Sequence, residues 1–135
     1  MDELQLWNLW SSNRIGSGLI NIGIVLAIWL SIRIAAATRA SDEATLLTKL
    51  ISTGFGLTIL SFAWEQYTIV ANLWISTARG LSDLKEAGTE ITSTADGFIA
   101  YVGTTDPATT PIPIGIAFIV ISGLIIVGNI WLPKK

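Results

Sequence analysis

Three long apolar stretches constrain the fold of this chain more than any other feature. Residues 15–34 and 112–132 carry almost no charge, and residues 46–75 contain a single carboxylate, Glu65. A bilayer core about 30 Å thick is crossed by about 20 helical residues, whereas a helix in a water-soluble core rarely has more than about 10–14 apolar residues in a row. We therefore predict an all-α integral membrane protein with three transmembrane helices at about these positions, forming a single transmembrane domain over residues 1–135.

The composition excludes several classes of function. Charged residues make up 13% of the chain, about half of the roughly 25% that is usual in soluble proteins. The net charge of -2 comes with no basic cluster, so no nucleic-acid partner is expected. The chain has no cysteine and no histidine, the residues that hold most haem, copper, zinc and iron–sulfur centres. We predict no cofactor and no catalysis by the chain itself, which can still belong to an enzyme complex; a bound lipid stays open.

The second apolar stretch is followed by a segment, residues 77–111, that we place outside the hydrocarbon. Apolar side chains recur in its first part at intervals of three and four, as in an amphipathic helix: Ala78, Leu81, Leu84, Ala87, Ile91, Ala95, Phe98 and Val102. Three glycines, Gly88 among them, weaken this helix by about 1 kcal/mol each relative to alanine. Residues 103–111 contain two prolines and form a loop. The sequence thus predicts an amphipathic extramembrane helix over 77–102.

Polar residues before the first two apolar stretches indicate where those helices begin. Residues 1–14 are read as a short lead-in at the headgroup boundary, with Ser11, Ser12 and Asn13 as capping residues for the first membrane helix. Residues 35–49 are read as a polar connector. Within it, Ser41 is followed by two carboxylates and is therefore the expected cap of the second helix.

The distribution of lysine and arginine predicts the orientation in the membrane, because these residues accumulate on the cytoplasmic side. The first connector, counted from Arg33, holds three of them, and two more, Lys134 and Lys135, end the chain. With three spans, these segments fall on the side opposite the acidic segment 77–111. We expect a multi-pass protein of a prokaryotic plasma (inner) membrane, with the N-terminus outside and the C-terminus in the cytoplasm.

The second apolar stretch carries a polar stripe. Its members are small, hydroxylated, amide or acidic, and they are spaced by three or four residues: Gly54, Thr58, Ser61, Glu65, Thr68 and Asn72. This spacing places them on one face of a helix. In a membrane, such a face is typical of a helix that packs against other protein through small and polar residues. These six residues are the candidate functional site.

Glu65 is the stripe's only ionisable member, and three interpretations of it stay open. A carboxylate at the centre of a membrane helix costs about 2.5–3.5 kcal/mol, so it usually faces a bundle interior or a wet cavity. First, Glu65 can accept hydrogen bonds from, or pair with a cation of, a neighbouring subunit. Second, the membrane boundary can fall near Trp64 and Tyr67 and leave the carboxylate in water. Third, the carboxylate can titrate or bind a cation in a transport path.

Two further patterns have structural explanations. Four tryptophans lie where an interfacial aromatic belt is expected: Trp7, Trp10, Trp74 and Trp131. Small and polar residues at a spacing of seven mark a packing seam on the third membrane helix: Gly115, Ser122 and Asn129.

Small size, three spans and polar seams favour one function over the others. We expect a non-catalytic accessory or structural subunit of a larger membrane complex, with other membrane subunits and the lipid bilayer as its partners. The alternative is a small homo-oligomeric transporter or channel component that uses Glu65.

Overall fold

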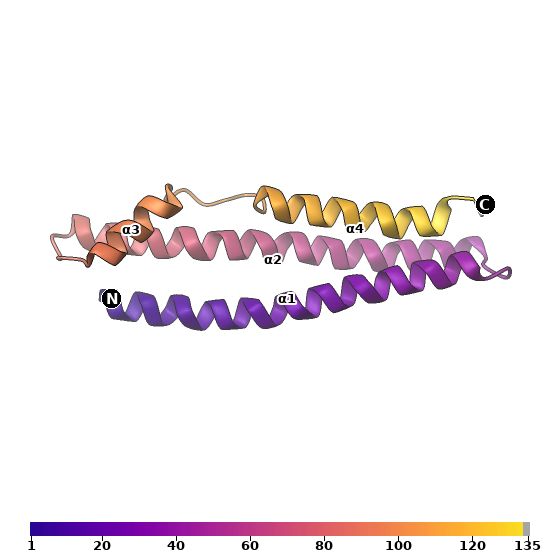
Figure 1. Ribbon diagram of the computed structural model, residues 1–135, viewed down its shortest axis with the longest axis horizontal. Helices are drawn as coiled ribbons and strands as arrows, with labels where there is room; N and C mark the ends of the chain where they lie inside the picture. The colour runs from indigo at the N-terminus through magenta and orange to yellow at the C-terminus, as the bar shows by residue number, and fades with distance from the viewer. Residues whose placement is uncertain (134–135) are drawn as a thin grey trace.

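A computed structural model describes residues 1–133 and contains, within them, four helices and no strand (Figure 1). These are α1 (Glu3–Ala40), α2 (Leu46–Glu86), α3 (Ser93–Val102) and α4 (Pro113–Trp131). In Figure 1, α1 and α2 run antiparallel along the long axis of the molecule. There, α4 lies beside the half of α2 that is nearer the α1–α2 loop, and α3 lies at the other end of α2.

Three of the helices are long and apolar enough to cross a membrane. They are α1, α2 and α4, with 38, 41 and 19 residues. The all-helical class and the three membrane-length apolar helices predicted from the sequence are therefore confirmed, as expected for a multi-pass membrane protein. Lys134 and Lys135, which contribute to the predicted orientation, lie outside the described residues.

The first two helices begin elsewhere than the capping residues suggested. Asp2 caps α1: its carboxylate accepts from the backbone N–H of Gln5 at 2.8 Å, and the Gln5 side chain accepts from the Asp2 N–H in return. This reciprocal capping starts the helix at Glu3, so the expected lead-in is helical and continuous with the apolar stretch. Ser41 ends α1, and Thr45 caps α2.

The helix predicted over 77–102 is divided between two elements. Its first part, as far as Glu86, continues α2 without interruption. Gly88 then adopts a φ of 82°, which only glycine adopts without strain, and the chain turns. After the turn, Thr92 caps α3 by accepting from the N–H of Ala95.

The core lies where α1, α2 and α4 meet, and it is formed by residues spaced three, four or seven apart on each helix. Its buried members are Ile24, Ile28, Ala35, Leu60, Ala63, Ile119, Ile126 and Ile130. Small residues allow the helices to approach closely: a Cβ placed on Gly56 would lie 2.8 Å from Cγ2 of Ile126. The predicted seam of α4 is used inside the chain, because Gly115 faces the Tyr67 ring and Ser122 is buried.

Candidate functional site

The polar stripe of α2 is largely left open by the other helices. Gly54, Thr58, Ser61 and Glu65 are exposed, and a Cβ on Gly54 would have no neighbour within 4 Å. The Thr58 hydroxyl donates to the Gly54 carbonyl, and the Ser61 hydroxyl donates to the Leu57 carbonyl, each at 2.9 Å. Both hydroxyls therefore bond within the helix, and none of these four side chains is covered by another helix.

The buried face of α2 is a different one. Ser52, Gly56, Leu60 and Ala63 face α1 and α4. The open part of the stripe, Gly54 to Glu65, is consequently available to molecules outside the chain.

Glu65 borders a shallow hollow between α2 and α4. The hollow has a volume of about 470 Å³ and is lined by Ser61 and Trp64 of α2 and by Ile119 and Gly123 of α4, among others. Within residues 1–133 the Glu65 carboxylate has no hydrogen bond or ion pair. Ile119 lies six residues into α4, which is about 9 Å along the helix at 1.5 Å per residue. Tyr67, two residues after Glu65, faces Gly115, so the hollow adjoins the first half of α4 and Glu65 lies level with about the first two turns of that helix.

The far end of the stripe is covered by the chain itself. The Asn72 amide donates to the Ala108 carbonyl at 2.9 Å and accepts from the Ala108 N–H at 2.8 Å. The Thr68 hydroxyl donates to the Trp64 carbonyl and is half-buried. Together with a hydrogen bond from Arg79 to the Thr105 carbonyl, the Asn72 pair fixes the loop between α3 and α4 against α2. Asn72 is thus part of an internal contact, unlike the first four members.

Three of the four tryptophans assigned to an interfacial belt lie together at the α3 end, whereas Trp131 donates to the Thr53 hydroxyl at the other end. Trp7 and Trp10 of α1, Trp74 of α2 and Phe98 of α3 form an aromatic cluster with ring centroids 5.2–5.9 Å apart. Edge contacts dominate, and Trp74 stacks on Phe98. Such ring pairs contribute about 0.5–1.5 kcal/mol each beyond burial of their area. The aromatic cluster therefore joins three helices.

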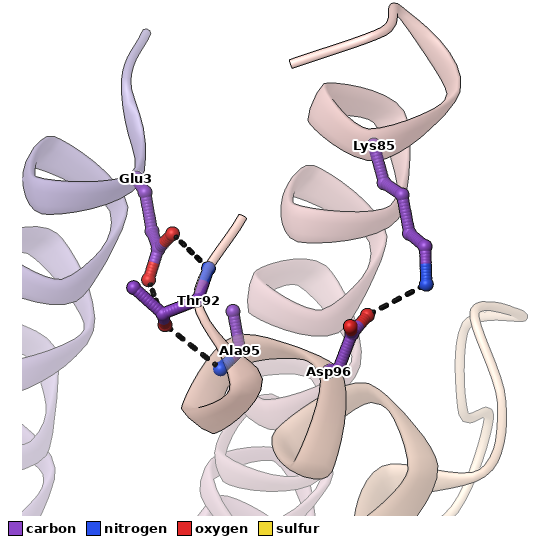
Figure 2. Close-up of polar contacts among 5 residues, drawn as sticks. All are labelled: Glu3, Lys85, Thr92, Ala95 and Asp96. Carbon is purple, nitrogen blue, oxygen red and sulfur yellow. Dashed lines mark hydrogen bonds and ion pairs between the residues drawn. The ribbon is translucent and has the colours of Figure 1, made fainter. Parts of the chain in front are cut away.

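Polar contacts reinforce this end of the molecule (Figure 2). The Glu3 carboxylate accepts from the Thr92 hydroxyl at 2.6 Å, from the Thr92 N–H at 2.9 Å and from the Trp7 indole N–H at 3.0 Å. These bonds, the Thr92 hydroxyl first, lower the pKa of Glu3, which precedes the apolar stretch of α1. Lys85 and Asp96 form an exposed ion pair at 2.7 Å, which adds at most about 1 kcal/mol.

Sequence reasoning missed three polar residues that face a groove beside this cluster: Arg14, Asn21 and Gln66. They lie on two helices, so no single-helix pattern connects them. Within residues 1–133, no group of three or more acidic side chains is close enough to hold a metal ion. No protein-family model, curated protein or solved structure matches the chain.

Proposed function

We propose that the protein is a non-catalytic subunit of a larger membrane complex, and that a partner helix packs on the open part of the stripe, Gly54 to Glu65. The observation that carries this proposal is the exposed Glu65 carboxylate, which has no partner within residues 1–133 and borders a hollow between α2 and α4. The open side of Gly54 supports it, because small residues let a second helix approach closely.

The energetics favour a covered carboxylate over one facing lipid. An acidic residue in a membrane helix costs about 2.5–3.5 kcal/mol when it faces hydrocarbon. A donor or cation on a partner helix offsets that cost, and the adjoining hydroxyls of Thr58 and Ser61 are already bonded within α2. The partner is therefore expected to present a hydrogen-bond donor or a basic side chain at the level of Glu65.

The same proposal includes a membrane orientation. In it, α1, α2 and α4 cross the membrane, and the part of the chain from residue 77 to residue 111 lies outside the hydrocarbon on the non-cytoplasmic side. The excess of lysine and arginine around the first connector supports this orientation.

The test compares two substitutions of Glu65 in the native membrane. Glu65→Gln keeps the size and most of the hydrogen-bonding capacity, so the partner should be retained. Glu65→Leu leaves the partner's buried donor unpaired, at about 1–3 kcal/mol, and should reduce retention markedly. Glu90→Leu, at an exposed position in the α2–α3 turn, is the control. Retention is measured by gentle detergent extraction, sizing and mass spectrometry.

Each alternative interpretation gives a different result. Full retention of partners by the Leu variant would contradict the proposal and indicate a carboxylate in water. A homo-oligomer whose Gln variant assembles but loses transport would indicate the transporter or channel component.

A further inference from the structure

A continuous groove runs between α1 and α2 toward the start of α4. It consists of three adjoining hollows with volumes of about 250, 360 and 680 Å³, and Val70 and Trp74 line all three. The first hollow lies between α1 and α2, the second reaches Phe118 of α4, and the third is bordered by the α3–α4 loop. Sites for small molecules usually have about 300–1,000 Å³, so the groove is large enough for a ligand.

Arg14 lies at the rim of this groove with its charge unneutralised. Its guanidinium carbon is 5.4 Å from the ring centroid of Trp10 and 5.2 Å from that of Trp74. These cation–π contacts orient the group. Within residues 1–133, no carboxylate pairs with it and no hydrogen bond engages its N–H groups. A guanidinium held by two indoles, with its donors free, has the geometry that suits a phosphate or carboxylate.

Two amide side chains line the groove deeper in the apolar region. Asn21 and Gln66 both border the first hollow, and neither has a side-chain hydrogen bond within residues 1–133. Asn21 follows Arg14 by seven residues, which corresponds to about 10 Å along α1. Asn21 also borders the second hollow, whose lining is mostly apolar and includes Ile114 and Phe118. The groove therefore combines a cation, two amides and an apolar wall.

We propose that this groove binds a phospholipid with an anionic headgroup. The phosphodiester accepts hydrogen bonds from Arg14, the ester oxygens accept from the amides of Asn21 and Gln66, and an acyl chain lies along Phe118. A phospholipid offers a group for each part of this lining, an anion for the cation, ester oxygens for the amides and hydrocarbon for the apolar wall, whereas a partner helix would not need an unpaired cation beside two unpaired amides. The groove is separate from the hollow at Glu65, so this proposal does not depend on the partner proposed above.

The test measures lipid retained by the purified full-length chain. The protein is extracted in a mild detergent, incubated with dioleoylphosphatidylglycerol and analysed by native mass spectrometry. Arg14→Gln should weaken binding roughly tenfold to a hundredfold, the loss typical of a charge-assisted hydrogen-bonded pair. Arg33→Gln removes an exposed charge from the other end of α1 and should leave binding unchanged.

A second pair of variants tests the groove itself. Val70→Trp fills the point shared by the three hollows and should also abolish retention, while Val25→Trp, exposed on α1, should not. Circular dichroism of each variant confirms that its helices are intact. Equal lipid binding by Arg14→Gln and the unchanged protein would overturn the proposal, as would retention by Val70→Trp. Displacement of the lipid by millimolar inorganic phosphate would likewise overturn it, since the site would then recognise a free anion.

Discussion

The contact between Gly56 and Ile126 makes a sharp prediction about packing between α2 and α4. In Gly56→Ala, the new Cβ would lie 2.8 Å from Cγ2 and 3.4 Å from Cδ1 of Ile126. Carbon atoms pack best at about 3.5–4.0 Å. Because Ile126 is 1% exposed, it has little room to move away.

The size of the effect follows from two opposing contributions. Overpacking of a core costs about 1–3 kcal/mol, and replacing glycine by alanine inside a helix gains about 1 kcal/mol. Gly54→Ala is the matched control, because the same helix gains the same propensity with no neighbour within 4 Å. In the isolated chain, Gly56→Ala should therefore be about 1–3 kcal/mol less stable than Gly54→Ala.

The assay is unfolding of the purified chain by titration with SDS in mixed micelles, followed by circular dichroism. A double-mutant cycle identifies the cause. In an Ile126→Ala background Cγ2 is gone, so Gly56→Ala should no longer destabilise relative to Gly54→Ala. If the two single alanine variants of α2 unfold at the same free energy, the close approach of α4 is not a feature of the protein in solution.

Three further predictions concern the end of the molecule that carries α3. Asn72→Ala removes both hydrogen bonds to Ala108 and should lower the local stability of the α3–α4 loop by about 1–3 kcal/mol, seen as faster hydrogen exchange there; unchanged exchange would contradict it. The hydrogen bonds from Thr92 and Trp7 to the Glu3 carboxylate should be fully present above pH 4.5, the ordinary pKa of that group. They should be lost as the pH falls through the lowered pKa that Glu3 has in the folded protein. Trp7 fluorescence should report that change, and the Glu3→Gln variant should show no such titration. The same titration in both proteins would mean that Glu3 is not the group that titrates. A cysteine introduced at Thr104 should react with an impermeant reagent from outside the cell, and labelling only from inside would reverse the orientation.

The sequence predicted the membrane-length helices because their signal is strong and local. An uncharged run such as that of residues 112–132 has few structural alternatives, and Pro113 marks the start of its helix. The stripe from Gly54 to Asn72 falls within the continuous helix α2, so its spacing of three and four residues puts its members on one face of that helix.

Contacts between distant segments could not be predicted in this way. Asn72 belongs to the stripe by spacing, yet its amide bonds Ala108 of a loop that is far away in sequence. Gly88 was recognised as a weak point, but its φ of 82° depends on α3 folding back to pack Phe98 on Trp74. Glycine permits the turn at Gly88, but the spacing of apolar residues did not show that the helix divides there and not at Gly80 or Gly97.

The uninterrupted course of α2 has a mechanical consequence. At 41 residues it is a rod about 60 Å long, and it contains no proline at which it could bend. The open part of the stripe lies in its first half, and the α3 contacts lie at its far end. If α2 tilts as a rigid unit about one position, every other position on the helix moves in proportion to its distance from that position. A molecule that bound at the stripe and tilted α2 would therefore also change the position of α3, which packs against the other end of the same helix.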